Sequence, residues 1–359
     1  MGMRVAFRTD ASIQIGTGHV MRCLTLADAL AAKGAQCKFI CREHPGNLID
    51  YIRSKGHAVY RLHMGAEADA DLAHSEWLGA TQAQDAQACE STIATLQPDW
   101  LVVDHYALDA RWESVLAEHG CQLMVIDDLA DRPHACQLLL DQTFGRNAKN
   151  YRPLVPEDCT LLCGSSYALL RPEFAALRPY SLQRRVQPQL KHLLVTLGGV
   201  DKDNVTAQVL TVLRVCPLPD DCKITVVMGS TAPWLADVKQ QTLSMPWPTT
   251  VRVGVNNMAQ LMADCDLAIG AAGATSWELC CLGVPNLLVC TAVNQLTVIG
   301  ALASANATVT LDRVELSQPD GVPLLTQIAV LTENLASYAN AAARITDGSG
   351  ASRVCAELA

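Results

Sequence analysis

The chain has 359 residues, too many for one typical hydrophobic core, so we expect two domains. Half of the residues are hydrophobic and 18% are charged, which is the composition of an ordinary soluble globular protein. A formal net charge of −9 argues against a nucleic-acid-binding surface, and no apolar run is long enough to span a membrane.

The fifteen cysteines include no Cys-x-x-Cys pair, which argues against a zinc ribbon or a thioredoxin-like site. Several of them fall inside apolar patterns, where thiols act as small hydrophobic groups. No signal-peptide pattern precedes the first strand. We therefore expect free thiols, a reducing cytoplasmic environment and no metal site.

The first half of the chain alternates between strand and helix patterns. The expected strands are Arg4–Thr9, Gln36–Cys41, His57–Leu62, Trp100–Asp104 and Gln122–Asp127. The expected helices between them lie at residues 20–30, 47–55, 77–96 and 111–119. This alternation predicts an α/β fold with a doubly wound parallel sheet, whose ligands bind at the carboxyl ends of the strands.

A glycine turn, Gly16-Thr17-Gly18-His19, lies between the first strand and the first helix. Glycine lets the backbone approach a ligand closely, and the helix start presents unpaired N–H groups. A histidine in the first turn of a helix is kept neutral by the helix dipole, as a general base must be. The alternative is that His19 only caps the turn.

Polar residues follow three of the expected strands. Asp10 follows the first strand, Asp104-His105-Tyr106 ends the fourth, and Asp127-Asp128 ends the fifth. The last pair has the pattern of a helix cap. The other polar residues would face the same crevice as His19, and a structural role for His105 is equally open.

The alternation breaks between about residues 151 and 188, where five prolines occur. Arg171 precedes a proline and so cannot lie in the middle of a helix. We interpret this stretch as an interdomain connection. The expected domains are residues 1–180, residues 181–335, and a helical tail over residues 336–359 that packs back on the first domain.

A second alternating unit follows the connection. Its expected strands are Leu193–Leu197, Lys223–Met228, Val251–Val255, Leu267–Gly270 and Val284–Cys290. Gly198-Gly199-Val200-Asp201 follows the first of them and opens a helix near Asn204.

A turn of small residues, Gly273-Ala274-Thr275, lies between a buried strand and a helix start, a geometry that suits a diphosphate. It matches neither the Gly-x-Gly-x-x-Gly nor the Walker pattern. Glu278, three residues later, either completes a capping box or accepts hydrogen bonds from a ribose. With Asn294-Gln295, these turns favour a nucleotide pocket.

Eight segments in order along residues 4–300 carry a family resemblance. They are Phe7–Ser12, Ile15–Arg22, Val103–Tyr106, Ile126–Asp128, Ser166–Arg171, Leu197–Asp201, Ala271–Glu278 and Asn294–Gln295. This ordered set resembles the hydrolases that act on UDP-2,4-diacetamido-2,4,6-trideoxy-β-L-altropyranose in pseudaminic acid biosynthesis. That family is similar in fold to the peptidoglycan N-acetylglucosaminyltransferase, which implies two Rossmann-like domains facing across a cleft, the GT-B fold.

The resemblance implies that water attacks the anomeric carbon and UDP departs with inversion, with His19 as the catalytic base. It implies supporting roles for Asp10, Gly18 and Arg22, and sugar contacts for Tyr106, His105 and Arg171. The residues expected to bind UDP are Gly198, Gly199, Asp201, Val255, Gly273, Ala274, Thr275, Glu278, Asn294 and Gln295. It implies no metal or cofactor, no nucleic-acid or membrane partner, and a cytoplasmic monomer.

Three other interpretations stay open. The chain could be a GT-B glycosyltransferase with a UDP-sugar donor, a non-catalytic nucleotide-sugar-binding protein, or a hydrolase of a related UDP-diacetamido sugar. Residues 67–90 are acidic and polar, unlike the membrane-facing patch of a transferase with a lipid-linked acceptor. The stretch from Glu67 to Gln87 is also extra length relative to the smallest members of the family.

Overall fold

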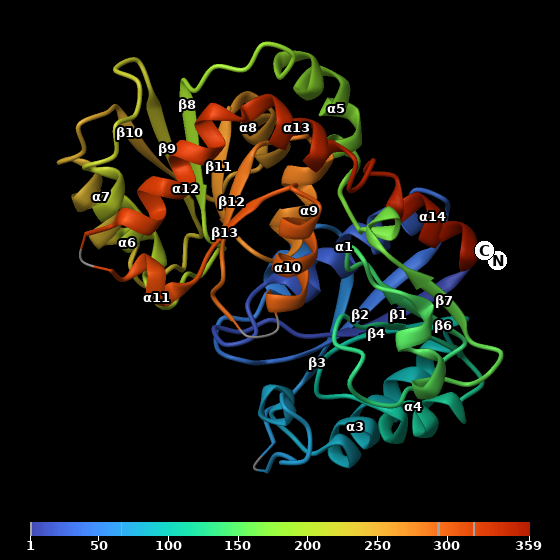
Figure 1. The fold of residues 1–359 in the computed structure, drawn as a ribbon. Helices are drawn as coiled ribbons and strands as arrows, with labels where there is room; N and C mark the ends of the chain where they lie inside the picture. The colour runs from blue at the N-terminus through green and yellow to red at the C-terminus, as the bar shows by residue number, and fades with distance from the viewer. Residues whose placement is uncertain (1, 66, 293–294, 319) are drawn as a thin grey trace. The chain divides into compact units, whose positions relative to one another are not determined.

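The computed structural model describes residues 2–65, 67–292, 295–318 and 320–359 (Figure 1). The chain divides into two compact units. Unit 1 comprises Met1–Leu169 and Gly350–Ala359, and unit 2 comprises Leu170–Ser349. Each unit contains a parallel β-sheet with helices packed against it.

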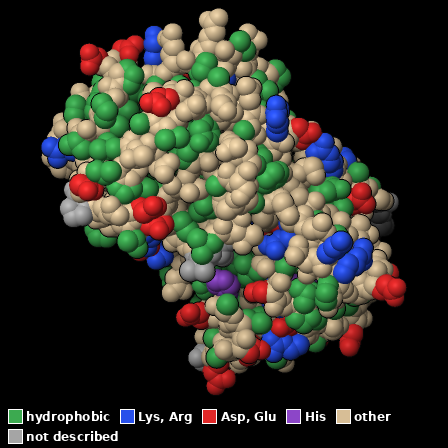
Figure 2. All heavy atoms as spheres, in the orientation of Figure 1, with side chains coloured by type: hydrophobic (Ala, Val, Ile, Leu, Met, Phe, Trp, Pro, Cys, Tyr) green, Lys and Arg blue, Asp and Glu red, His purple; other side chains and the backbone are tan. Residues whose placement is uncertain are grey.

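Charged side chains of both signs lie on the surface. On the face shown in Figure 2, Asp and Glu side chains are interspersed with Lys, Arg and hydrophobic side chains. The cysteines are free thiols, and most of them are buried, as their apolar sequence surroundings predict. Within the described ranges, none of the helices has the length and apolar character needed to span a lipid bilayer.

In the described part of unit 1, seven parallel strands form one sheet in the order β3-β2-β1-β4-β5-β6-β7. The strands are β1 (Arg4–Thr9), β2 (Gln36–Arg42), β3 (Ala58–Leu62), β4 (Trp100–Asp104), β5 (Gln122–Ile126), β6 (Leu138–Asp141) and β7 (Thr160–Cys163). The helices are α1 (Gly18–Ala31), α2 (Ile49–Ser54), α3 (Gln82–Leu96), α4 (Ala110–Ala117) and α14 (Gly350–Glu357). Four 3-10 helices are η1 (Ser75–Leu78), η2 (Ala148–Asn150), η3 (Arg152–Leu154) and η4 (Ser165–Tyr167).

Both faces of the central strands of this sheet are buried. Val5 and Phe7 of β1 belong to one hydrophobic cluster, and Ala6 between them belongs to the cluster on the other face. Strands that are buried on both faces have continuous apolar sequences rather than alternating ones. This is why the central strands β1, β4 and β5 could be recognised from the sequence.

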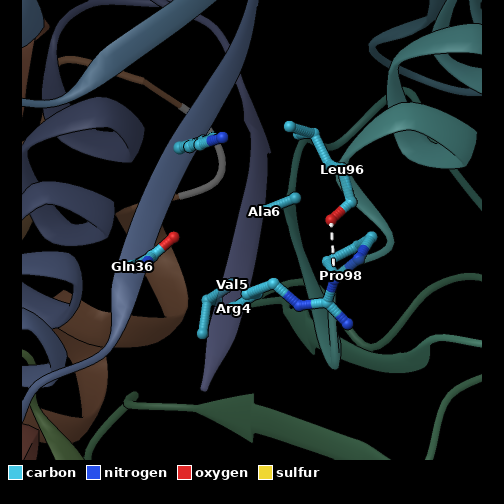
Figure 3. Close-up of a pocket in the computed structure, with 7 residues that line it drawn as sticks. Arg4, Val5, Ala6, Gln36, Leu96 and Pro98 are labelled. Carbon is cyan, nitrogen blue, oxygen red and sulfur yellow. Dashed lines mark hydrogen bonds between the residues drawn. The ribbon is translucent and has the colours of Figure 1, made fainter. Parts of the chain in front are cut away.

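A small pocket lies at the amino ends of the strands in unit 1 (Figure 3). It is lined by Arg4, Val5, Ala6, Gln36, Lys38, Leu96 and Pro98. The Arg4 guanidinium donates a hydrogen bond of 3.4 Å to the backbone oxygen of Leu96. The lining contains no carboxylate, histidine or thiol, so this pocket offers no candidate for acid–base or nucleophilic chemistry.

In the described part of unit 2, six parallel strands form a sheet in the order β10-β9-β8-β11-β12-β13. The strands are β8 (His192–Thr196), β9 (Lys223–Met228), β10 (Thr249–Val253), β11 (Leu267–Ala271), β12 (Asn286–Val289) and β13 (Val309–Leu311). The helices are α5 (Pro172–Arg184), α6 (Val205–Leu213), α7 (Leu235–Thr242), α8 (Met258–Asp264), α9 (Ala274–Cys281), α10 (Leu296–Ser304), α11 (Arg313–Leu316), α12 (Val322–Glu333) and α13 (Leu335–Ala343).

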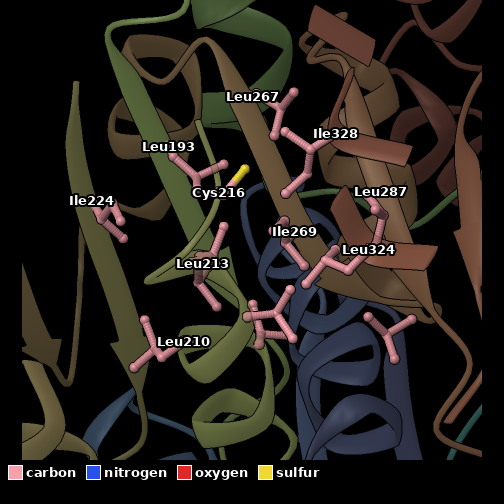
Figure 4. Packing of buried hydrophobic residues seen from close by; sticks show 14 of the residues in the cluster. Leu193, Leu210, Leu213, Cys216, Ile224, Leu267, Ile269, Leu287, Leu324 and Ile328 are labelled. Carbon is pink, nitrogen blue, oxygen red and sulfur yellow. The ribbon is translucent and has the colours of Figure 1, made fainter. Parts of the chain in front are cut away.

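The core of unit 2 lies between its sheet and the helices α6 and α12. Leu193 and Ile269 project from the central strands toward Leu213 of α6 and Leu324 of α12 (Figure 4). All four side chains are at most 1% exposed. This packing fixes the sheet and so holds the loops at its carboxyl edge in place.

The chain passes from unit 1 to unit 2 at Leu169, ahead of the expected boundary at residue 180. The expected connection contains α5, which packs against α8 and α9. Arg178 of α5 donates hydrogen bonds to the backbone oxygens of Cys281 and Ala343. These contacts make α5 part of unit 2.

In both sheets the first strand of the unit lies beside the fourth. Thr9 at the end of β1 is in register with Asp104 at the end of β4. Thr196 at the end of β8 is in register with Gly270 near the end of β11. The strand order reverses at these pairs, and ligands of open α/β sheets bind outside the carboxyl ends of the strands at such a point.

Candidate active site

His19 lies in the first turn of α1, beside the carboxyl end of β1, as the sequence predicts. The loop before it is held by Ser12, whose hydroxyl oxygen accepts hydrogen bonds from the backbone N–H groups of Gln14 and Ile15. Gly16 has a φ of +79°, a conformation that glycine adopts without strain. The loop therefore places His19 at the carboxyl ends of β1 and β4, where the strand order reverses. His19 is 8% exposed there.

Asp104 is the partner of His19. Nδ1 of His19 lies 2.6 Å from Oδ1 of Asp104, which is fully buried at the end of β4. An ionised carboxylate only accepts hydrogen bonds, so Nδ1 carries a proton, and in the neutral ring the free lone pair is on Nε2. Among the described residues, none forms a hydrogen bond with Nε2.

Arg22 keeps Asp104 ionised. Its Nε and Nη2 donate to the two carboxylate oxygens of Asp104 at 2.6 and 2.7 Å, and its Nη1 donates to Asp128 at 2.5 Å. Burial alone would raise the pKa of Asp104, but the guanidinium charge and the contact with His19 outweigh it and hold that pKa well below its usual range. The expected supporting residue Arg22 is thus in contact with the His19–Asp104 pair, through the carboxylate.

Tyr106 completes this group of residues. Its hydroxyl donates a hydrogen bond of 2.8 Å to Asp128, and its ring meets the His19 ring edge-on with centroids 4.5 Å apart. Asp128, interpreted from the sequence as a helix cap, instead accepts hydrogen bonds from Arg22 and Tyr106. The structure therefore brings Tyr106 beside His19, as expected.

His105 and Asp10 lie in a neighbouring buried network. Nδ1 of His105 accepts a hydrogen bond from the N–H of Ala107, and its Nε2 lies 3.4 Å from Asp10. Asp10 also pairs with Arg8 at 2.7 Å and accepts from the N–H of Arg42. Both residues are almost fully buried and hold polar partners, so their geometry is that of structural side chains next to the site.

Two aromatic residues that sequence reasoning did not select lie near Tyr106. His74 and Trp77 come from the segment around η1, with the rings of Trp77 and Tyr106 stacked at a centroid distance of 6.0 Å. The sequence pattern placed Trp77 at the start of a long helix, but α3 begins only at Gln82. The capping box of Thr81 and Gln84 was a local signal for that later start.

In unit 2, the expected phosphate turn lies at the carboxyl end of β11. Gly273 is the N-cap of α9, and Gly273 and Ala274 are exposed. The N–H of Gly273 donates to the hydroxyl of Ser276, and Thr275 is half-buried. N–H groups in the first turn of a helix have no intrahelical acceptor, so this exposed turn can bind an anion.

Glu278 lies one turn further along α9. Burial raises the pKa of its carboxyl to about 7, with Arg171 acting in the opposite direction from 3.8 Å away. Arg171 is the N-cap of α5 and also pairs with Glu173 at 3.1 Å. Arg171 therefore belongs to unit 2, whereas the other expected sugar-binding residues, Tyr106 and His105, belong to unit 1.

The remaining expected UDP-binding residues follow the ends of β8, β10 and β12. Gly198 has a φ of +96°, and the backbone oxygen of the exposed Gly199 accepts from the N–H of Gly229. The carboxylate of Asp201 accepts from the N–H groups of Val205 and Thr206, so it caps α6.

Val255 is half-buried after β10. Gln295 accepts a hydrogen bond from the N–H of Thr291 at the start of α10. Asn294 lies outside the described residues. Across the described residues, no three His, Cys, Asp or Glu side chains are grouped so as to hold a metal ion.

Comparisons with known proteins agree with this architecture. No family model matches the chain. The chain is 28% identical to the UDP-2,4-diacetamido-2,4,6-trideoxy-beta-L-altropyranose hydrolase of Campylobacter jejuni, over 82% of this chain and 93% of that protein. It is 30% identical to the spore coat polysaccharide biosynthesis protein SpsG of Bacillus subtilis, over 99% of this chain and 98% of that protein.

Solved structures of low sequence identity share the fold. The structure of Acinetobacter baumannii MurG aligns with a TM-score of 0.70 and 14% identity, over 99% of each chain. The calicheamicin glycosyltransferase CalG4 aligns with a TM-score of 0.64 and 14% identity, over 99% of this chain and 97% of that one. The fold is therefore the expected GT-B fold of two Rossmann-like domains. The identity to SpsG over nearly the full length of both proteins, together with the match to the Campylobacter jejuni hydrolase, shows that the chain belongs to their family.

Proposed function

We propose that the protein is a hydrolase that releases UDP from UDP-2,4-diacetamido-2,4,6-trideoxy-β-L-altropyranose, giving 2,4-diacetamido-2,4,6-trideoxy-L-altrose. The name of the Campylobacter jejuni relative and the eight family segments support this substrate. By the same resemblance, the enzyme acts as a cytoplasmic monomer without a metal ion. Its product enters pseudaminic acid biosynthesis and the glycosylation of flagellin or cell-surface polysaccharide.

The observation that carries the proposal is the pair of His19 and Asp104. In the reaction, a water molecule attacks the anomeric carbon and gives its proton to Nε2 of His19. The C–O bond to the diphosphate breaks, UDP leaves with the bonding electrons, and a single displacement inverts the anomeric centre. Asp104 fixes the ring and the tautomer of His19 and stabilises the imidazolium that forms, while Arg22 holds Asp104 in place.

We assign the nucleotide to unit 2. The exposed first turn of α9, at Gly273–Thr275, would bind the diphosphate and stabilise the charge that develops on it as it leaves. Glu278 would accept hydrogen bonds from the ribose. The loops at Gly198–Asp201 and Val255 would contact the uracil, and Asn294 and Gln295 would lie near the nucleotide.

The test uses purified protein, the UDP-sugar and no acceptor, with release of UDP as the measurement. The wild type should release UDP, whereas His19→Ala should lose turnover by about 10²- to 10⁴-fold while binding UDP nearly as well. Asp104→Asn, which keeps the side-chain shape but permits the wrong tautomer, should also lose kcat. Turnover that survives in His19→Ala would overturn the assignment of the base.

The second candidate is a GT-B glycosyltransferase, since MurG and CalG4 share the fold. A transferase would release little UDP until an acceptor is supplied. A protein that binds UDP tightly but releases none under any condition would instead be a non-catalytic binding protein. A panel of UDP-linked diacetamido sugars, compared by kcat/KM, would distinguish the altrose substrate from its epimers.

A further inference from the structure

We infer that His74 and Trp77, together with Tyr106, form an aromatic wall against which the sugar ring of the bound UDP-sugar packs. This inference rests on the proposed function and deepens it, because it names the part of unit 1 that recognises the sugar. Neither His74 nor Trp77 was selected by the sequence motifs.

The three rings form a continuous group that ends at the candidate base. The centroids of His74 and Trp77 are 4.3 Å apart, and those of His74 and Tyr106 are 5.5 Å apart. Tyr106 then contacts His19 at 4.5 Å. A sugar ring that lies against this wall would therefore have its reacting carbon near His19.

The wall keeps surface available for a ligand. Tyr106 is 7% exposed and His19 is 8% exposed, whereas His74 and Trp77 are only half-buried. A tryptophan ring offers a large apolar face and a polar N–H, which suits it to packing against a ligand. Trp77 stacks on the buried Tyr106, which in turn contacts His19, so its ring lies one residue away from the candidate base.

Polar contacts hold the segment that carries the wall. The carboxylate of Asp69 accepts a 2.7 Å hydrogen bond from the N–H of Gln82 at the start of α3. Asp71 pairs with Arg111 of α4 at 2.5 Å. The first contact joins the chain ahead of η1 to the start of α3, and the second joins it to α4, so both support the position of the segment that carries the rings.

The chemistry of the wall suits an uncharged, deoxygenated sugar. Burial lowers the pKa of His74, so its ring is neutral at neutral pH. Aromatic faces pack well against C–H groups and methyl groups. A 2,4,6-trideoxy sugar with acetamido groups presents more such surface than an ordinary hexose, so the wall should favour the former.

The test measures how much the sugar adds to the affinity of UDP. His19→Ala is used as the background so that the ligand is not consumed, and calorimetry gives the Kd of UDP and of UDP-2,4-diacetamido-2,4,6-trideoxy-β-L-altropyranose. Adding Trp77→Ala should leave the Kd of UDP within about twofold and weaken binding of the UDP-sugar by about five- to tenfold. Trp77→Phe should recover most of the loss.

Tyr180→Ala is the control, because Tyr180 is an exposed aromatic residue of α5 in unit 2, outside the loops assigned to UDP. It should change neither Kd. If Trp77→Ala does not fold, Trp77→Leu preserves bulk and replaces it, with folding checked by circular dichroism. The inference is overturned if the ratio of the Kd of UDP to the Kd of the UDP-sugar is unchanged in these variants. The rings would then pack only against the rest of the segment and not against the sugar.

The two proposals fail separately. A wild-type protein that releases no UDP overturns the hydrolase, but the binding comparison still tests the wall. Even if the wild type releases no UDP, weaker binding of the UDP-sugar by Trp77→Ala supports the inference that the aromatic wall contacts the sugar. Unchanged affinity overturns the wall and leaves the hydrolase standing.

Discussion

At the scale of single residues, Asp104 is the central group of the site, because it accepts hydrogen bonds from both His19 and Arg22. One oxygen accepts a hydrogen bond from Nδ1 of His19, and both oxygens accept hydrogen bonds from Arg22. A buried aspartate that paired only with a histidine would be held in its ionised form less firmly. The guanidinium therefore secures the orientation of His19 through the carboxylate.

The sequence marked His19 and placed Asp104 in the same crevice, but it did not show that the two residues are hydrogen-bonded partners. His19 is marked by glycines and by a helix start, which are local signals. Asp104 lies 85 positions away in the chain, and only the pairing of β1 with β4 brings the two side chains together. Asp128 has the sequence pattern of a cap, and its contacts with Arg22 and Tyr106 depend on three separate elements.

Glu278 gives a prediction about stability and pH. Its pKa of about 7 lies above the ordinary value of 4.5, so the folded protein holds this proton more tightly than the unfolded chain does. The resulting stabilisation is full below pH 4.5 and is lost as the pH rises through about 7. Replacing the group by an always-neutral one, in Glu278→Gln, should remove this dependence.

The measurement is the thermal midpoint of both proteins from pH 4.5 to about pH 8. As the pH rises, we expect the thermal midpoint of Glu278→Gln to increase relative to that of the wild type. The difference should level off above about pH 7.5. Glu333→Gln, at an exposed position in the same unit, is the control and should follow the wild type. If the thermal midpoints of Glu278→Gln and the wild type differ by the same amount at every pH, the raised pKa of Glu278 is contradicted.

At the scale of elements, the C-terminal helix α14 returns to unit 1. It packs against α1, and Val354 and Leu358 belong to the core of that unit. The sequence led us to expect that the whole tail over residues 336–359 packs there, but α13 contacts α9 within unit 2. Both helices have an apolar face, and the apolar pattern alone does not say which sheet that face will cover.

Leu358→Ala tests this attachment. Leu358 is 3% exposed, and its backbone oxygen accepts a hydrogen bond from Nε1 of Trp100 in β4. The substitution should lower the free energy of unfolding by about 2–3 kcal/mol, because it leaves a cavity in the core of unit 1. Urea denaturation measures the loss. Glu357→Ala, its exposed neighbour, should cost less than about 0.5 kcal/mol, and equal effects of the two substitutions would show that the helix is not docked.

At the scale of the whole molecule, the same topology occurs twice. Each unit places its first strand beside its fourth, so each has one reversal point at the carboxyl edge of its sheet. In unit 1 this point carries His19 and Asp104, and in unit 2 it carries Gly198 and the Gly273 turn. The protein thus has the His19–Asp104 pair in one unit and the exposed N–H groups of a helix start in the other.

This division predicts which segments UDP protects from hydrogen exchange. Hydrogen exchange, measured with and without saturating UDP, should slow in peptides that span residues 197–201 and 271–278. Peptides from α1 should exchange at the same rate, because we assign them to the sugar and not to the nucleotide. Protection confined to unit 1 would contradict the assignment of the nucleotide to unit 2.

The sequence by itself determined the α/β class, most of the strands, the position of His19 at a helix start and the small-residue turn before α9. These features depend on local patterns of apolar residues, glycines and caps, which act within a few positions of the chain. Only the tertiary structure decided that Asp104 and Arg22 hold His19, that His74 and Trp77 lie beside Tyr106, and that α5 and α14 belong to different units. The physical reason is that strand pairing and helix docking join residues far apart in sequence, and many partners would satisfy the same local pattern.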